Sequence, residues 1–230
     1  MKSNIQIIRY QDCESSLWKN GGGSTKQLLI SPKAADLNNF DFRISIATIL
    51  SDGPFSQFLG IDRQLCILEG EGVRLNIKAD NLALSEEVVI LGPNDPPFCF
   101  SGEIPIESEL LDKQILDFNV MTRRASYTAR IERIECNGTL EIETKANSAH
   151  LSANEQSIQF LLPLAPITCI YQGEKMALQR YDLLQLAEEQ EATVKYFTLI
   201  SSKKCQLIRV FIEATQSLVL SNNLAQSIPD

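Results

Sequence analysis

Alternation of apolar and polar residues, repeated in short runs along the chain, is the feature that most restricts its fold. In residues 40–46 (FDFRISI) every even position is apolar and every odd position is polar. A period of two is typical of a strand with one buried face. No long segment has the apolar spacing of an amphipathic helix. The pattern therefore predicts an all-β protein.

Other strand-like runs follow at short intervals, separated by turn sequences such as residues 69–72 (EGEG) and 92–97 (GPNDPP). This spacing is typical of a β-sandwich or β-barrel. The predicted strands are residues 5–10, 26–30, 63–68, 73–77, 88–91, 115–121, 127–134, 157–162, 167–171, 193–200 and 205–212.

An internal repeat indicates two units. A shift of 94 positions aligns residues 66–68 with 160–162, 82–84 with 176–178 and 89–90 with 183–184, and it places Val73 on Ile167. Two β units of about a hundred residues each fit the 230-residue chain. We expect an N-terminal barrel over residues 1–125 and a C-terminal barrel over 126–230, with a partly ordered tail from about residue 214.

The composition narrows the range of functions that the chain can have. Hydrophobic residues make up 44% of the chain, so a folded core is expected, and the net charge is −8. The densest basic spots are the pairs Arg123-Arg124 and Lys203-Lys204, so we expect binding to neither nucleic acid nor membrane. No secretion signal and no apolar run of ~20 residues is visible, which favours a cytoplasmic protein.

Histidine and cysteine usage restricts the chemistry further. The one histidine, His150, lies in a polar stretch and is expected in a solvated loop, although a lone-His or Ser/His catalytic role stays open. The six cysteines lack metal-ligand spacing. Those inside apolar runs, Cys66, Cys99 and Cys169, are expected to be small buried side chains in a reducing compartment rather than disulfide partners.

Residues 18–26 (WKNGGGSTK) contain three consecutive glycines. The order differs from that of a phosphate-binding loop, and a strand rather than a helix follows. Two interpretations stay open: a glycine turn before an edge strand, or a pocket wall in which the backbone approaches a ligand beside Trp18 and Asn20.

Four sequence blocks, in this order, resemble the HutD/Ves family: residues 18–25 (WKNGGGST), 40–47 (FDFRISIA), 52–72 (DGPFSQFLGIDRQLCILEGEG) and 117–124 (DFNVMTRR). The resemblance implies a bacterial bicupin, which is two cupin β-barrels in one chain. It also implies an accessory or regulatory protein of histidine utilisation or of a stress response, binding a small acid of the formylglutamate or urocanate type. A homodimer is the assembly expected at family level.

The metal chemistry of cupins is not expected. Counted from Gly53, the two histidine positions of the metal motif fall on Leu59 and Ile61. The catalytic histidine of metal-free epimerase cupins is missing too, so we expect neither a metal nor another cofactor.

The candidate ligand-binding residues follow from the matching blocks. Arg43 and Arg63 are the expected anion clamp, because guanidinium groups bind carboxylates in a bidentate manner. Asp62-Arg63 could instead be a local ion pair or a turn, and Glu69 could brace a hairpin. Asp117 and Asn119 share one strand face, either in a network across the barrels or in contact with a ligand. The full candidate set is Trp18, Asn20, Arg43, Asp52, Phe55, Phe58, Asp62, Arg63, Glu69 and Asn119.

Three functions compete. The first is a non-catalytic protein that binds a carboxylate, with Trp18, Phe55 and Phe58 as the apolar wall. The second is a metal-independent isomerase or hydrolase that uses carboxylates such as Asp52, Asp62 or Glu69. The third is a module that binds another protein. The residues favour the first.

Overall fold

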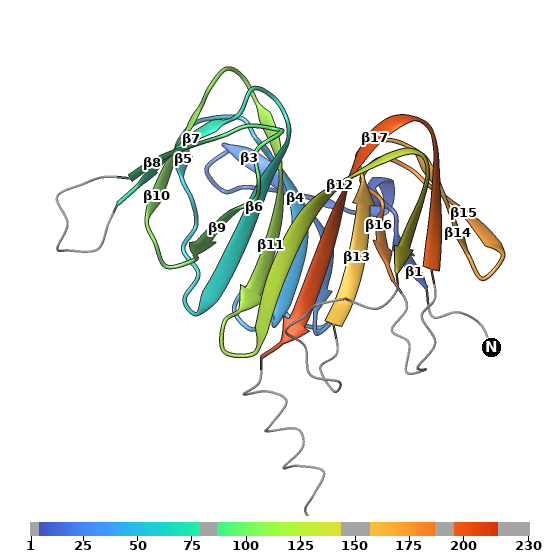
Figure 1. The fold of residues 1–230 in the computed structure, drawn as a ribbon. Coiled ribbons are helices and arrows are strands. Elements are labelled where there is room, and N and C mark those ends of the chain that lie inside the picture. The colour runs from blue at the N-terminus through green and yellow to red at the C-terminus, as the bar shows by residue number, and fades with distance from the viewer. Residues whose placement is uncertain (1–4, 79–86, 144–156, 187–195, 216–230) are drawn as a thin grey trace, which may run out of the picture. The chain divides into compact units, whose positions relative to one another are not determined.

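The computed structural model describes residues 5–78, 87–143, 157–186 and 196–215. The chain divides into two compact units: the N-unit, residues 13–125, and the C-unit, residues 1–12 with 126–230. In the described residues the secondary structure is seventeen strands and one short 3-10 turn, η1 (Tyr10–Asp12) (Figure 1). The all-β prediction is confirmed.

The N-unit contains two antiparallel sheets whose facing sides form one apolar core, with Leu65, Ile67 and Phe100 on one side and Leu75 and Ile106 on the other. The six-stranded sheet has the order β2-β3-β4-β11-β6-β9: β2 (Ser15–Leu17), β3 (Gly23–Ser31), β4 (Phe42–Ile49), β11 (Ile115–Arg123), β6 (Ile61–Glu69) and β9 (Phe98–Ser101). The four-stranded sheet has the order β5-β10-β7-β8: β5 (Gly53–Pro54), β10 (Ile106–Leu110), β7 (Val73–Ile77) and β8 (Glu87–Leu91).

The C-unit is one seven-stranded antiparallel sheet. Its longest strands, β12 and β17, pair with each other and are visible side by side in Figure 1. The predicted runs 193–200 and 205–212 belong to one strand, β17, although residues 193–195 lie outside the described part. The strands are β1 (Gln6–Ile8), β12 (Tyr127–Glu143), β13 (Ser157–Pro163), β14 (Ile167–Tyr171), β15 (Glu174–Leu178), β16 (Leu183–Gln185) and β17 (Tyr196–Ala214).

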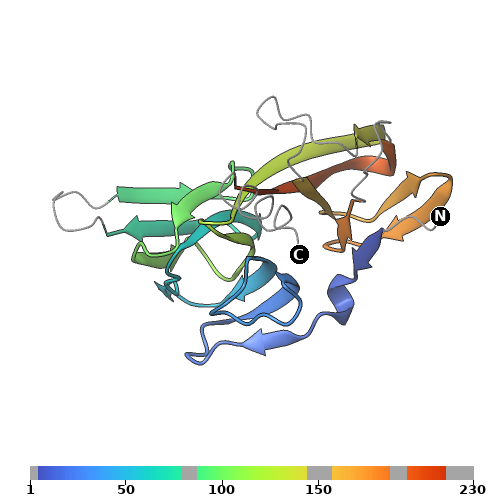
Figure 2. The same cartoon turned by 90° about the horizontal axis from the view of Figure 1, so that it is seen from below.

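The chain divides between residues 125 and 126, and the first twelve residues, which were expected in the N-terminal barrel, belong to the C-unit. Strand β1 pairs with β16, and Figure 2 shows this dark blue strand beside the orange part of the chain. The buried carboxylate of Asp182 anchors the segment: it accepts hydrogen bonds from Arg9 Nη1 at 2.5 Å and from the Tyr10 backbone N–H at 3.1 Å.

The 94-residue repeat corresponds to real strands. Shifted by 94, β7 coincides with β14 at both ends, and β6 overlaps β13. Residues 82–84 of the alignment, His150 and the predicted tail beyond residue 215 lie outside the described residues.

The burial of the cysteines was predicted with one error. Cys66 and Cys169 are buried, whereas Cys99 is exposed. Strand β9 turns Phe98 and Phe100 toward the apolar core, so the alternation points Cys99 outward. All six cysteines are free thiols. Within the described residues, no helix is long and apolar enough to cross a membrane.

Candidate functional site

A cavity of about 840 Å³ lies within the N-unit. Its floor is the inner face of the six-stranded sheet, formed by β3, β4, β6 and β11. The turn after β2 and the segment around β5 complete its wall, with Trp18, Asn20 and Phe55 among the lining residues.

Strand register explains why polar groups converge on this floor. Residues paired across antiparallel strands point to the same face. Asn119 on β11 is paired with Ser45 on β4 and with Leu65 on β6. Two residues before Asn119 on β11, Asp117 is paired with Ala47 on β4 and Ile67 on β6. Two residues after it, Met121 is paired with Arg43 on β4 and Arg63 on β6. The polar positions of β4 thus face the cavity rather than solvent.

Arg63 is the more deeply buried of the two arginines, with 8% of its surface exposed. Its guanidinium lies 4.9 Å from the ring centre of Phe100, 5.3 Å from that of Phe55 and 5.8 Å from that of Phe58. Nη1 donates to the carbonyl oxygen of Ser56 at 3.1 Å, and within the described structure Nε has no partner. Burial lowers the pKa of Arg63 to about 10, although nearby Asp117 opposes this shift.

Arg43 lies on β4, which is separated from β6 by β11, and is half-buried. Its Nε donates to Gln27 Oε1 at 2.9 Å, and Nη1 contacts Met121 Sδ at 3.8 Å. Burial lowers the pKa of Arg43, and the negative charge of Asp117 partly offsets that effect. Both guanidinium groups therefore act electrostatically on the same carboxyl group.

Asp117 and Asn119 each have one side-chain oxygen that accepts no hydrogen bond from the described residues. Their exposed fractions are 4% and 6%, and one side-chain oxygen of each, Oδ1, has no hydrogen-bond partner among the described residues. Burial raises the pKa of Asp117 to about 7, while Arg63, a backbone hydrogen bond at Ala47 and Arg43 act in the opposite direction. Unpaired buried polar atoms facing a cavity are groups that a ligand can satisfy.

The segment with three glycines is both a turn and a part of the cavity wall. The segment is the hairpin turn between β2 and β3, with Gly21 at φ +73°, and it also forms cavity wall. A Cβ on Gly23 would lie 2.3 Å from the Thr48 carbonyl oxygen and 3.0 Å from the Trp18 ring. Glycine thus lets Trp18 pack on the strand, where its Nε1 donates to Thr25 Oγ1 at 2.8 Å.

The structure brings most of the predicted site residues together. The cavity is lined by eight of the ten: Trp18, Asn20, Arg43, Asp52, Phe55, Phe58, Arg63 and Asn119.

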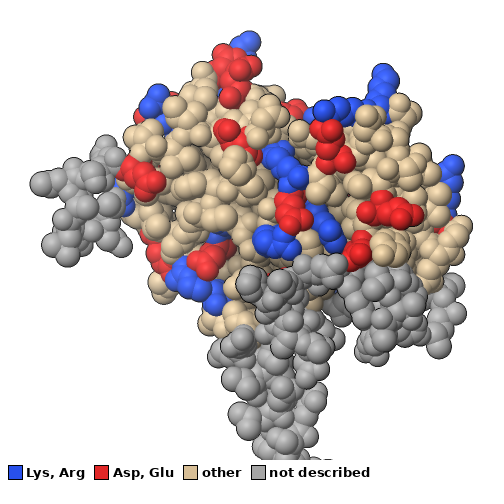
Figure 3. Space-filling model, viewed as in Figure 1, with Lys and Arg blue, Asp and Glu red and all other residues tan. Residues whose placement is uncertain are grey.

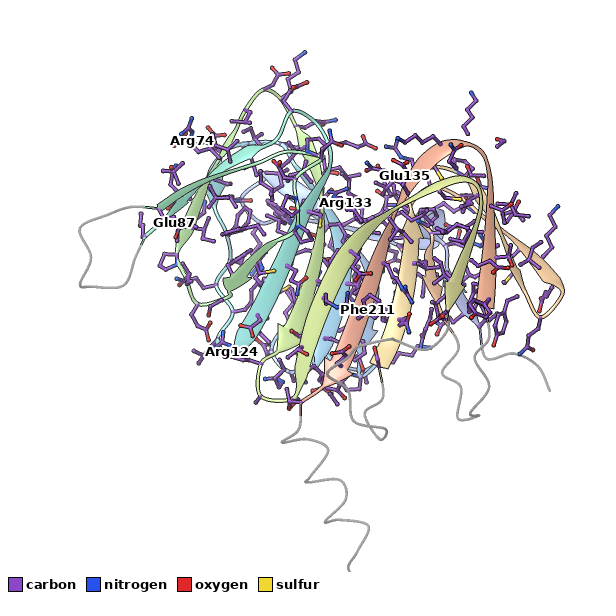
Figure 4. The ribbon with its side chains drawn as sticks, viewed as in Figure 1. Arg74, Glu87, Arg124, Arg133, Glu135 and Phe211 are labelled. Atoms are coloured by element: carbon purple, nitrogen blue, oxygen red, sulfur yellow. The ribbon has the colours of Figure 1, made fainter. Side chains whose placement is uncertain are left out.

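The other two, Asp62 and Glu69, lie outside the lining. Asp62 is next to Arg63 on β6 and so points to the opposite face, where Arg124 Nε donates to its Oδ1 at 2.7 Å. Figure 4 labels Arg124 at the lower end of the N-unit. A local Asp62–Arg63 ion pair is therefore wrong. Glu69 is exposed at the end of β6, just before the turn.

Several lining residues were missing from the predicted set, chiefly Asp117, Ser45, Gln27 and Met121. Asp117 shares the face of Asn119, as its spacing predicted, and the pairing of β11 with β4 and β6 turns that face inward. Alternation along β11 was the available signal. Nothing in the local sequence marked Gln27, which reaches the floor because it is paired with Ser45.

No three His, Cys, Asp or Glu side chains converge as a metal site in the part of the chain that the structure describes. On the face shown in Figure 3, acidic and basic side chains are interspersed.

Solved structures define the class of protein. A protein from Pseudomonas aeruginosa PAO1, PA5104, superimposes with a TM-score of 0.75 at 26% identity, over 91% of this chain and 99% of that one. HutD from Pseudomonas fluorescens SBW25 gives 0.66 at 27% identity, over 90% and 97%. Oxalate decarboxylase from Bacillus subtilis shares the fold alone, with a TM-score of 0.61 at 8% identity, over 92% and 78%. The chain is a cupin-fold protein with two β-barrel units, a bicupin.

Sequence comparisons define the family. The HutD profile matches residues 10–202. An uncharacterised 21.2 kDa protein from the hutC 3′ region of Pseudomonas putida is 34% identical over 157 residues, which is 68% of this chain and 77% of that protein. Protein Ves of Escherichia fergusonii is 34% identical over 117 residues, 50% of this chain and 56% of Ves. The chain belongs to the HutD family.

Proposed function

We propose that the N-unit binds a small carboxylate metabolite in its cavity, with Arg43 and Arg63 as the anion-binding groups. The observation that carries the proposal is the state of Arg63. It is a nearly buried guanidinium facing a cavity, and within the described structure its Nε lacks an acceptor. A carboxylate supplies acceptors in the geometry that a guanidinium matches.

The energetic argument follows from burial. A buried hydrogen-bonding atom without a partner costs about 1–3 kcal/mol, and more if it is charged. The aromatic rings of Phe55, Phe58 and Phe100 around Arg63 partly compensate for its lost hydration. A bound carboxylate would add charge-assisted hydrogen bonds in a site already screened from water.

The family membership supports a more specific ligand. We infer an acid of the formylglutamate or urocanate type and an accessory or regulatory role in histidine utilisation or a stress response. The cavity volume of about 840 Å³ lies within the usual range for small-molecule sites and accommodates either acid.

A second function is favoured by one observation, the buried carboxyl of Asp117 with its pKa raised to about 7. Such a group can accept or donate a proton at neutral pH, as an acid or base in a metal-independent isomerase or hydrolase would. The carboxylates first considered for this chemistry do not pair in the cavity, because Asp62 and Glu69 lie outside its lining.

A fluorescence titration tests the proposal, because Trp18 is the one tryptophan of the chain and lines the cavity. Formylglutamate and urocanate are titrated into the protein, with product analysis of every mixture. Saturable binding without product supports the binding protein, and product formation supports the enzyme.

Thermal unfolding gives an independent readout, since a ligand at 100 times its Kd stabilises the fold by about 2.7 kcal/mol. Arg43→Ala should remove the shift, while Arg74→Ala, on the other sheet at an exposed position, should keep it. If neither acid changes fluorescence or unfolding temperature, the carboxylate proposal fails.

A further inference from the structure

Asp117 shares the floor of the cavity with Arg43 and Arg63. It lies on β11, flanked by β4, which carries Arg43, and by β6, which carries Arg63. Both arginines act on the charge of Asp117, since each lowers its pKa against the opposing effect of burial. With Asp117 ionised the floor has a net charge of about +1, and with it protonated about +2.

Other charged groups do not change this balance. The next strand, β3, contributes the neutral Thr25 and Gln27 to the lining, and β10 contributes Ser108. Among the described lining residues, three more are charged: Glu14, Lys19 and Asp52. All three are exposed, so water and salt screen their charges.

A ligand carboxylate bound to the two guanidinium groups of Arg43 and Arg63 would share the cavity floor with Asp117. Two carboxylates around one buried site repel each other, and the usual outcome is that one takes up a proton. We propose that Asp117 determines which ligands this site accepts, by taking a proton from solvent onto Oδ1 whenever a carboxylate binds to Arg43 and Arg63. The inference rests on the proposed carboxylate binding and adds its proton coupling.

The geometry of Asp117 suits this function. Oδ1 has no hydrogen-bond partner among the described residues, so it has room for a proton. Once protonated, the group changes from an acceptor that repels the ligand into an O–H donor that can bind it. The pKa of about 7 in the unliganded protein means that the proton is gained or lost near neutral pH. At low pH the doubly positive floor favours dianionic acids over monoanionic ones.

Calorimetric titration with formylglutamate at pH 6, 7 and 8 tests the inference. This acid has two carboxylates and changes its own charge only at lower pH. Each titration is repeated in buffers of different ionisation enthalpy, which gives the number of protons taken up. We expect close to one proton at pH 8, few at pH 6, and about tenfold weaker binding at pH 8 than at pH 6.

Asp117→Asn keeps the shape of the side chain and removes its titration. Its affinity should be the same at pH 6 and pH 8, with no proton uptake, and at pH 8 it should bind more tightly than the wild type. Asp112→Asn makes the same change at an exposed position outside the cavity lining and should behave like the wild type.

The outcomes separate the two proposals. Binding without proton uptake, or pH dependence retained in Asp117→Asn, overturns the inference and leaves the binding function standing. Binding by Asp117→Asn alone also overturns the inference, because the wild-type Asp117 then excludes the ligand without taking up a proton, and it leaves the binding function standing. If neither protein binds formylglutamate at any of the three pH values, both the inference and formylglutamate binding fail.

Discussion

Both units are built from antiparallel strands, but their described interiors differ in polarity. In the N-unit, the polar side chains of the sheet face a cavity and retain unpaired atoms. The apolar core of the C-unit contains Tyr171 and Phe197, which are fully buried and stack with their ring centres 4.2 Å apart. The described part of the N-unit therefore has a polar cavity, whereas the described core around Tyr171 and Phe197 is apolar.

Residues at equivalent positions make the contrast concrete. Strand β13 corresponds to β6 in the 94-residue repeat, and its Leu161 is paired with Arg209, as Ile67 of β6 is paired with Asp117. Arg209 Nη2 donates to Gln159 Oε1 at 2.5 Å and to the Glu143 carbonyl oxygen at 3.0 Å. Phe211 also covers its guanidinium, at 4.6 Å. Arg209 thus has protein acceptors at the position equivalent to Asp117, whose Oδ1 has no partner among the described residues.

The largest expected effect is on the stability of the apolar core of the C-unit. Phe197→Ala should lower the free energy of unfolding by about 3–5 kcal/mol, because it removes a fully buried aromatic side chain that cannot be replaced by water. Phe55→Ala, in the half-exposed cavity wall, should cost less. Urea unfolding followed by circular dichroism measures both. Equal losses would mean that the N-unit interior is packed as tightly as that of the C-unit.

The two arginines give the next largest effect, on affinity. Arg63→Met should weaken carboxylate binding by about 2–4 kcal/mol, roughly 30- to 1,000-fold, because Met keeps the apolar stem and loses the charge. Arg209→Met is the matched change in the C-unit and should leave affinity unchanged. Titration of both variants with the same acid decides the matter, and a comparable loss in Arg209→Met would contradict the assignment of the site to the N-unit.

The two buried aspartates should respond in opposite directions to the same substitution. Asp182→Asn should destabilise the protein by about 1–3 kcal/mol, since its oxygens accept bonds from Arg9, Tyr10 and Gln179. Asp117→Asn should stabilise it at pH 8. The folded-state pKa of Asp117 is about 7 against an ordinary 3.8, so its ionisation reduces stability progressively as pH rises from about 4 to about 7.

Unfolding curves at pH 5 and pH 8 measure this pair of variants. The wild type should lose stability between the two values, and Asp117→Asn should lose less. Identical pH dependence in the wild type and Asp117→Asn would show that Asp117 is not the titrating group.

The smallest effect concerns the network outside the cavity. The side chain of Arg124 is 46% exposed and forms ion pairs with Asp62 and Glu103. A double-mutant cycle of Arg124→Gln and Asp62→Asn should give a coupling of only about 0.2–1 kcal/mol, because solvent screens exposed ion pairs. Neither substitution should alter ligand affinity. A loss of binding in Asp62→Asn would mean that Asp62 contributes to the binding site.

Local patterns were sufficient for much of the fold. The alternation in β7 and β14 predicted both strands with their observed ends, and the 94-residue spacing aligned them with each other. Short strands without clear alternation, such as β2 and β5, were missed. Residues 1–12 belong to the C-unit rather than to the unit that follows them in the chain, because the partner of β1 is β16, far away in the sequence.

The site shows the same division. The sequence by itself determined the β class, the family blocks and the arginines Arg43 and Arg63, since alternation and residue type are local properties. Only the tertiary structure decided that Asp62 points away from the cavity and that Asp117 shares the cavity floor with the two arginines. The physical reason is that a side chain's pKa and partners depend on the strands that pair beside it and on how much water they exclude.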